Sequence, residues 1–242
     1  MDDPPLRLSF GNLAETYHRV RPAYSQKLLD RAQMLLELGS DAHVLDLAAG
    51  TGRLTGELTQ RFAHVIAVEP SDAMRALIST EDVRAGSAEA IPVADASVDA
   101  VFVGEAFHWF DTAAAIPEIA RVLRLRGGLA MVGERWWETE PPLPDAALDL
   151  LHEPWNRSLP LRNPPWDDAF EGTAFEPLRY EHFDDGIDLA ADELLELYST
   201  TSALAALPHD ERAALFARVR PLLGGTYRLP IKGELAWTRL AR

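Results

Sequence analysis

The feature that most constrains this chain is an alternation of short apolar runs and helical segments between residues 24 and 134. Such alternation is typical of βαβ units, in which helices cover both faces of a parallel sheet. Ser25 is expected to cap the first helix and Gly39 to end it, and Ser71 is expected to cap a later short helix. The strands expected here span residues 43–48, 64–69, 83–85, 99–103 and 129–133, and the longer helices span residues 28–36, 53–62 and 112–125.

The composition changes after residue 134. Seven of the 17 prolines and four of the six tryptophans lie between residues 134 and 166. An irregular, aromatic segment after the fifth strand would cover the carboxyl ends of the strands, where open α/β sheets bind ligands. A packing appendage that completes the core is the alternative. The elements expected here are helices at 145–152, 192–205 and 210–222 and strands at 175–183 and 234–240.

These elements predict one fold class. We expect an α/β protein with a doubly wound, Rossmann-like, seven-stranded and mostly parallel sheet, joined to a helical and irregular substrate cover. A length of 242 residues suits one large domain with an insertion better than two separate domains.

Charge and cysteine content exclude several functions. The chain has 38 Asp and Glu against 23 Lys and Arg, a net charge of −15, which argues against a nucleic-acid or anionic-membrane partner. No cysteine is present, so disulfides, thiolate catalysis and zinc–thiolate sites are excluded, and a cytoplasmic location is predicted. No apolar run is long enough to span a bilayer, and the acidic N-terminus does not look like a signal peptide.

The most informative segment follows the first expected strand. A buried strand leads into a turn containing Gly50 and Gly52, and a helix N-terminus with free N–H groups follows, as in nucleotide sites. Asp46 lies inside the strand, where a carboxylate would repel a pyrophosphate but suit the cationic end of a ligand. The alternative is a buried aspartate that the loop amides satisfy and that has no ligand role.

Two later segments fit an adenosine. Glu69 ends the second strand, where an acid can accept hydrogen bonds from both ribose hydroxyls, in NAD as well as in other adenosine cofactors. Residues 86–92 combine small and polar side chains, which suits a loop along the edge of an adenine. An ordinary surface loop is the alternative there.

Together these segments resemble the class I S-adenosylmethionine-dependent methyltransferases, in particular the type 11 branch, over residues 10–134. The resemblance rests on residues 45–52 (LDLAAGTG), 69–71 (EPS) and 86–89 (GSAE). The family's pattern Ile91-Pro92, Asp95 and Ser97-Val98-Asp99 follows the last of these segments. Residues 123–128 (LRLRGG) resemble the turn before the fifth strand, with Arg126 where proline is usual.

Two further boxes resemble the trans-aconitate methyltransferase-like subgroup. Residues 104–111 (GEAFHWFD) resemble its His-Trp-Phe-Asp box, and residues 17–24 (YHRVRPAY) resemble its N-terminal segment, which folds over the cofactor. The resemblance implies S-adenosylmethionine as cofactor, with S-adenosylhomocysteine as product. The cofactor contacts that it implies are Tyr17, Arg21, Asp46, Ala48, Gly50, Thr51, Gly52, Glu69, Pro70, Met74, Ser87, Ala88, Glu105 and Ala106.

The same resemblance implies a division of labour along one methyltransferase domain, residues 1–242. Residues 1–24 would form an N-terminal lid and residues 25–134 the cofactor-binding core. Residues 135–174 and 184–228 would form the substrate cover, and residues 229–242 would carry the final strand.

Methyl transfer from a sulfonium is an in-line displacement that mainly requires the acceptor to be held in place. His108 is the candidate catalytic base or acceptor-orienting group, and a histidine that only shapes its loop is the alternative. Aromatic side chains beside it can exclude water, and an arginine beside tryptophans can bind a carboxylated or planar acceptor, although core packing explains each equally well. The predicted substrate-binding residues are Phe107, Trp109, Arg135, Trp136 and Tyr198.

Other functions are disfavoured by missing motifs. The sequence has no metal-ligand spacing, no Gly-x-Ser-x-Gly elbow and no phosphate loop ending in Gly-Lys-Ser/Thr. The predicted function is S-adenosylmethionine-dependent methyl transfer to a small-molecule acceptor, with a carboxylic acid as the suggested class. A non-catalytic protein that binds S-adenosylmethionine or S-adenosylhomocysteine is the alternative. NAD-linked oxidoreduction is disfavoured by Asp46 and by the glycine spacing.

Overall fold

The chain divides into two compact units. A computed structural model describes residues 19–21, 23–135, 143–154 and 166–241. The larger unit, which we call the sheet unit, comprises residues 23–134, 161–183 and 233–242. The smaller one, the helical unit, comprises residues 1–22, 135–160 and 184–232.

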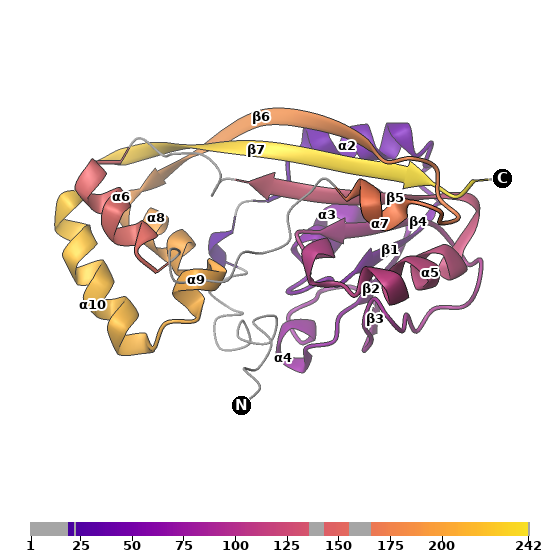
Figure 1. Ribbon diagram of the computed structural model, residues 1–242, viewed down its shortest axis with the longest axis horizontal. Helices are drawn as coiled ribbons and strands as arrows, with labels where there is room; N and C mark the ends of the chain where they lie inside the picture. The colour runs from indigo at the N-terminus through magenta and orange to yellow at the C-terminus, as the bar shows by residue number, and fades with distance from the viewer. Residues whose placement is uncertain (1–18, 22, 136–142, 155–165, 242) are drawn as a thin grey trace. The chain divides into compact units, whose positions relative to one another are not determined.

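Seven strands form one sheet in the order β3-β2-β1-β4-β5-β7-β6 (Figure 1). Strands β1 to β5 pair in parallel, and β7 runs antiparallel to them. The predicted α/β, doubly wound and mostly parallel seven-stranded sheet is therefore confirmed. The strands are β1 His43–Leu47, β2 His64–Val68, β3 Asp82–Arg84, β4 Val98–Gly104, β5 Leu123–Arg135, β6 Arg179–Ala190 and β7 Thr226–Arg239.

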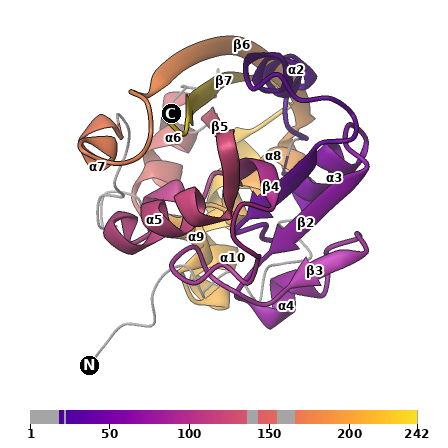
Figure 2. The ribbon, with the colours of Figure 1, turned by 90° about the vertical axis from the view of Figure 1, so that its right-hand side faces the viewer.

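Helices cover both faces of the parallel strands, as Figure 2 shows end-on. Because side chains alternate along a strand, Val44 and Phe102 face one apolar cluster with α2 and α3, whereas Leu45 and Val101 face another with α5. Burial on both faces explains why these strands appear in the sequence as nearly continuous apolar runs. The helices of this unit are α2 Gln26–Leu35, α3 Arg53–Thr59, α4 Asp72–Arg75, the 3-10 helix η2 Phe107–Trp109, α5 Thr112–Val122 and α7 Asp167–Phe170.

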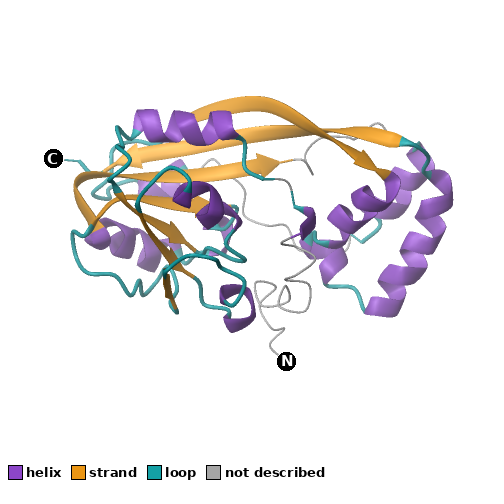
Figure 3. Ribbon diagram, turned by 180° about the vertical axis from the view of Figure 1, so that it is seen from behind, coloured by secondary structure: helices purple, strands orange, loops and turns teal. Residues whose placement is uncertain are grey.

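The helical unit has its own apolar core. Leu151 of α6, Leu194 and Leu197 of α8 and Leu215 of α10 are buried together. Figure 3 shows the helices of this unit in purple. No helix in the described ranges is long and apolar enough to cross a membrane. The helices of this unit are α6 Asp145–His152, α8 Ala191–Ser199, α9 Ser202–Ala205, α10 His209–Val219 and the 3-10 helix η5 Arg220–Leu222.

Several predicted helix ends are wrong. The first helix ends at Leu35, and Glu37, rather than Gly39, adopts the left-handed conformation after it (φ 53°). Ser25 occupies the predicted cap position, but its side chain makes no capping hydrogen bond. The helix predicted to reach residue 125 ends at Val122, because Leu123 already pairs with β4.

The outer strands and the late helices also differ from the prediction. The strand predicted at 175–183 lies at 179–190, and the strand predicted at 234–240 begins at Thr226. The helix predicted over 192–205 is interrupted after Ser199. Buried Thr200 follows α8, where its hydroxyl donates a hydrogen bond to the carbonyl oxygen of Leu197 and accepts one from Arg21.

Candidate functional site

Asp46 is a buried carboxylate near the carboxyl end of β1. Its side chain is 1% exposed, and its Oδ2 accepts a hydrogen bond of 2.6 Å from the hydroxyl of Thr55 on α3. Its Oδ1 has no hydrogen-bond partner. Burial raises the pKa of Asp46 to about 7; the hydrogen bond from Thr55 opposes this shift, and the neighbouring charge of Glu69 adds to it.

The turn after Asp46 has an unusual backbone conformation and contains a second buried oxygen without a hydrogen-bond partner. Ala48 adopts a left-handed conformation (φ 59°), which non-glycine residues rarely do. Gly52 has φ 81°, and a Cβ added there would lie 3.1 Å from the Cα of Ile78, so this position requires glycine. The hydroxyl of buried Thr51 has no hydrogen-bond partner. Strain and unpaired polar atoms in one turn are typical of a ligand site.

Glu69 connects this turn to the next one. The residue is 5% exposed, and its two oxygens accept backbone N–H groups, Oε2 from Gly50 at 2.9 Å and Oε1 from Ser71 at 2.8 Å. Burial raises its pKa, although both hydrogen bonds favour the ionised form. Pro70 is exposed between these contacts, and Met74 is buried on α4. One carboxylate therefore fixes the relative position of the two predicted cofactor turns.

The turn after β3 is held by close packing. A Cβ added at Gly86 would lie 2.5 Å from the Cδ atom of Pro92, so only glycine allows this approach. Ser87 and Ala90 form an antiparallel bridge, with Ala88 buried between them. We call residues 87–90 the β3 turn.

Strand β4 ends next to β1, its parallel neighbour in the sheet. Glu105 follows β4 in a left-handed conformation (φ 54°), and its carboxylate accepts the backbone N–H of Glu134. The carboxylate of Glu134 accepts the backbone N–H of Ser25 at 2.6 Å, which ties the start of α2 to the end of β5. Ala106 is buried after Glu105. Both β1 and β4 are thus followed by a strained residue, at Ala48 and Glu105.

The predicted catalytic segment forms η2. The His108 ring lies 4.8 Å from the Trp109 ring, and both residues are partly exposed. Phe107 is buried, with its ring 5.3 Å from that of Trp166 and 5.8 Å from that of Phe170. Phe107 therefore belongs to an aromatic cluster of the sheet unit.

The remaining predicted site residues belong to the helical unit or lie outside the described residues. Arg21 donates two hydrogen bonds of 2.9 Å to Thr200, one to its hydroxyl and one to its carbonyl oxygen. Tyr198 is buried in α8, and this burial raises its pKa to about 12. The backbone of Arg135 ends β5. Tyr17 and Trp136 lie outside the described residues.

We call the turn after β1, residues 48–52, the β1 turn. Two residues near it were not among the site residues predicted from the sequence. Thr55 anchors Asp46, and Tyr24 lies so close to β4 that a Cβ added at Gly104 would be 2.5 Å from its hydroxyl oxygen. The guanidinium of Arg53 lies 5.3 Å from the centre of the Tyr24 ring. A threonine on the buried face of the first turn of α3 was a usable signal. Tyr24 ends the segment, residues 17–24, that the resemblance places over the cofactor, but it was not among the predicted site residues.

The described ranges contain no cluster of His, Asp or Glu that could hold a metal ion. The profile of a methyltransferase domain family, type 11, matches residues 45–131. An uncharacterized methyltransferase of Mycobacterium tuberculosis is 36% identical over 222 residues, which cover 90% of this chain and 86% of that protein. The chain belongs to this methyltransferase family.

Two further proteins are similar to the chain. The malonyl-[acyl-carrier protein] O-methyltransferase of Dechloromonas aromatica is 31% identical over 134 residues, covering 52% of this methyltransferase and 51% of that protein. A solved structure described as a type II methyltransferase from Anaeromyxobacter dehalogenans has a TM-score of 0.61 at 22% identity, covering 92% and 97% of the two chains. This second likeness shows the fold.

The family decides between the predicted cofactors. The methyltransferase uses S-adenosylmethionine as methyl donor, so the prediction of an enzyme with this donor is confirmed and the NAD-linked alternative is wrong. The residues at the carboxyl ends of β1 and β2 fit the donor. Asp46 and Thr51 offer unpaired buried oxygens, and Glu69 offers a carboxylate held by two backbone N–H groups.

Proposed function

We propose that this methyltransferase acts on a small carboxylic acid, as its resemblance to the trans-aconitate methyltransferase-like subgroup implies. The observation that carries the proposal is the position of His108 and Trp109. Both lie in η2, which follows β4, and β4 is the parallel neighbour of β1 in the sheet. The aromatic residues there and the strained Glu105 are suited to closing off a small site rather than to binding a polymer.

Two further observations support a small acidic acceptor. The net charge of −15 disfavours RNA and DNA, which need clustered cations. The name of the Dechloromonas relative states O-methylation of a malonyl group, an acid-derived acceptor. A carboxylate is already ionised at neutral pH, so it needs no general base.

The donor supplies an electrophilic methyl group, which bonds to an acceptor oxygen while the carbon–sulfur bond breaks and its electron pair stays on sulfur, giving a methyl ester and S-adenosylhomocysteine. The work of the protein is to hold and align the acceptor. In this proposal His108 orients the carboxylate by a hydrogen bond, and Trp109 excludes water. Asp46, Thr51 and Glu69 bind the donor through the oxygens described above, and Met74, Ser87 and Ala88 contact its adenine.

The acceptor side of the proposal extends to residues beyond β4. Arg135 and Trp136 would bind the acid, and Tyr198 would line the same pocket, with Tyr17 and Arg21 closing over the donor. We further propose that residues 1–242 act as one methyltransferase domain, in which residues 25–134 hold the donor and residues 135–174 and 184–228 select the acceptor. An Arg135→Ala variant with undiminished turnover of the acid would contradict the role given to Arg135.

The test is an acceptor screen with a chemical check on the product. The protein is incubated with S-adenosylmethionine and panels of carboxylic acids, phenols and amines, and each mixture is searched by mass spectrometry for the gain of one methyl group. We expect a carboxylic acid to gain the methyl group and the product to revert to the acid in mild alkali, as a methyl ester does. Methylation confined to phenols or amines, or a product stable to alkali, would overturn the proposal.

His108 is tested on the acid that the screen identifies. Replacing His108 by Gln should lower kcat by roughly tenfold, less than the roughly 10²–10⁴-fold typical of acid–base catalysis, because His108 only orients the acceptor in this proposal. Trp109→Phe serves as the comparison variant, since it changes the same short helix and keeps an aromatic ring while removing only the indole N–H. An unchanged rate in His108→Gln would remove His108 from the mechanism while leaving the acceptor class intact.

A further inference from the structure

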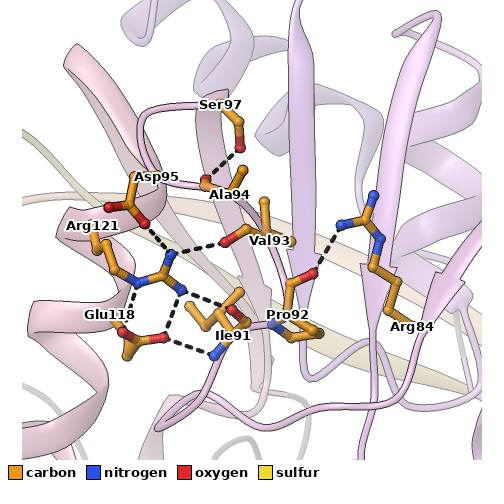
Figure 4. A network of polar contacts seen from close by, with 9 residues as sticks. All are labelled: Arg84, Ile91, Pro92, Val93, Ala94, Asp95, Ser97, Glu118 and Arg121. Atoms are coloured by element: carbon orange, nitrogen blue, oxygen red, sulfur yellow. Dashed lines mark hydrogen bonds and ion pairs between the residues drawn. The ribbon is translucent and has the colours of Figure 1, made fainter.

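Arg121 on α5 binds the backbone of a loop that is distant from it in sequence. Figure 4 shows its guanidinium donating to the carbonyl oxygens of Ile91 and Val93, each at 2.8 Å, and to the carboxylate of Asp95 at 2.6 Å. Glu118, one helical turn earlier, accepts from Arg121 at 2.7 and 2.8 Å. The same carboxylate accepts the backbone N–H of Ile91 at 2.9 Å. We call Glu118 and Arg121 the α5 clamp.

The clamp holds three backbone groups of the loop: the N–H and carbonyl oxygen of Ile91 and the carbonyl oxygen of Val93. All three guanidinium nitrogens of Arg121 donate, although its side chain is 30% exposed. The hydrogen bonds to Arg121 lower the pKa of Glu118, so that both groups are charged at neutral pH. A planar fork with this geometry fixes direction as well as distance, which a lysine could not do.

The clamped loop, residues 91–95, directly follows the β3 turn in the chain. Pro92 lies between the two clamped carbonyl groups and packs so closely on Gly86 that a Cβ at Gly86 would be 2.5 Å away. Arg84 of β3 holds the carbonyl oxygen of Pro92 at 2.8 Å from the other side. A shift of Pro92 would therefore move Gly86 and, with it, the start of the β3 turn.

The other end of α5 holds the same turn. Glu89, inside the β3 turn, accepts the backbone N–H of Asp111 at 3.1 Å. Asp111 is the N-cap of α5 and follows the η2 segment with His108 and Trp109. The β3 turn is thus attached to α5 through Glu89 at the N-terminal end of the helix and through the clamp near its C-terminal end.

We propose that Arg121 is a positioning residue for the methyl donor, which sets the conformation of the β3 turn through Ile91, Pro92 and Val93. The proposal rests on the adenine contact assigned to Ser87 and Ala88 in the proposed function. Arg121 does not touch the donor. Its loss loosens the adenine contact, so affinity for the donor falls while the rate of the bound enzyme is retained.

The experiment measures the dissociation constant of S-adenosylhomocysteine by calorimetry for the wild type and three variants, each at a temperature where thermal unfolding shows it to be fully folded. Arg121→Gln removes the clamp. Arg124→Gln is the control, because Arg124 is also a surface arginine paired with a carboxylate, Asp99 at 2.8 Å, but holds no loop carbonyl group in the described residues. Ser87→Trp tests the adenine contact itself.

We expect Arg121→Gln to weaken binding about tenfold or more, Ser87→Trp to weaken it as well, and Arg124→Gln to leave it within about twofold of the wild type. With an identified acceptor, Arg121→Gln should raise the KM of S-adenosylmethionine and leave kcat unchanged, a split that a general loss of stability does not produce. If Arg121→Gln does not fold, Arg121→Lys is measured instead, and a smaller weakening in the same direction is expected.

The outcomes separate the two levels of the proposal. Binding by folded Arg121→Gln, or by Arg121→Lys where that variant replaces it, within about twofold of the wild type overturns the positioning role. Equal weakening in Arg121→Gln and Arg124→Gln also overturns it, because the effect would then be general. Unchanged binding in Ser87→Trp shows that the β3 turn does not contact the adenine, which overturns the basis of the inference without touching methyl transfer itself.

Discussion

Asp46 and Asp99 lie at opposite ends of neighbouring strands and have opposite electrostatics. Asp46 is buried near the carboxyl end of β1, and burial raises its pKa to about 7. Asp99 lies at the start of β4, where burial also acts to raise the pKa, but hydrogen bonds from Arg124 and from the N–H of His43 outweigh it and lower the pKa. The same residue type thus has a complete set of partners at one edge and an unpaired oxygen at the other.

The difference separates buried polar groups that have partners within the protein from those that do not. The amino edge is the edge of the sheet at which the parallel strands begin. A cavity of about 310 Å³ there is lined by residues that include Asp99, Arg124 and Arg239. Arg124 pairs there with Asp99, and Arg239 pairs with Glu37 at 3.1 Å. At the carboxyl edge, Asp46 and Thr51 keep unpaired oxygens inside the protein, which costs folding free energy unless a ligand supplies the partner.

The largest expected effect on donor affinity is at Glu69. Glu69→Gln replaces an oxygen that accepts an N–H group by an amide that cannot, so one of the two turns loses its anchor. A hydrogen bond to a charged group contributes about 1.5–3 kcal/mol, and we expect the affinity for S-adenosylhomocysteine to fall about a hundredfold. Calorimetry measures the affinity, and urea unfolding measures stability.

Asp99→Asn is the matched control at the amino edge. It should lower the free energy of unfolding, because Asp99 loses its charge beside Arg124, and leave the affinity within about twofold. Equal losses of affinity in the two variants would show that the edges do not differ in function.

The second effect is on the pH dependence of stability. Because the pKa of Asp46 is raised to about 7 in the folded protein, its contribution to stability is present below the ordinary pKa near 4 and is lost as the pH rises through 7. The loss is on the order of 4 kcal/mol for a shift of about three units. Asp46→Asn removes this pH-dependent loss. In urea unfolding from pH 4 to pH 8, the free energy of unfolding of the wild type should therefore fall relative to that of the variant.

Asp99 sharpens this test because its sign is opposite. Its lowered pKa gives stability that is present above the ordinary pKa and is lost as the pH falls through the folded pKa. Asp99→Asn should therefore reduce stability at neutral pH and cost progressively less in acid. Parallel pH profiles for the two variants would contradict the electrostatic comparison.

The third effect concerns the backbone of the turn after β1. Gly52→Ala places a side chain at φ 81°, which costs about 1–2 kcal/mol, and brings a Cβ within 3.1 Å of the Cα of Ile78. We expect both stability and donor affinity to fall, the affinity by roughly tenfold. Gly39→Ala is the control, since nothing lies within 4 Å of its Cβ position, and it should be neutral or stabilising. Thermal unfolding and calorimetry on both variants measure the contrast.

The sequence predicted the parallel strands and the β1 turn because their determinants are local. Strands buried on both faces appear as apolar runs, and a left-handed turn with a close approach to Ile78 requires a glycine at position 52. The strand predicted at 175–183 overlaps β6 only over residues 179–183, because no residue of β6 is fully buried and its exposed positions do not alternate regularly. The break between α8 and α9 coincides with the hydrogen bonds between Thr200 and Arg21, which lie 179 residues apart.

The chemistry of the site was less accessible than its location. Asp46 and Glu69 were predicted as ligand residues, but the sequence could not show that Glu69 holds two turns by their N–H groups. Nor could it show that Asp46 keeps an unpaired oxygen. That depends on the packing of α3 on β1, which brings the hydroxyl of Thr55 to only one of the two carboxylate oxygens. Arg121 looked like an ordinary helix residue for the same reason, since its partners are backbone carbonyl groups of a distant loop.

The smallest expected effect is on the amino edge itself. Arg124→Gln removes a cation whose side chain is 42% exposed, and exposed ion pairs contribute at most about 1 kcal/mol. Asp99 keeps the N–H of His43 as a partner at 2.8 Å, so the variant leaves no unsatisfied carboxylate. We expect urea unfolding to show a loss below about 1 kcal/mol that shrinks further in concentrated salt. A larger loss, or one insensitive to salt, would mean that the pair at the amino edge is as shielded from water as Asp46, and the contrast between the two edges would fail.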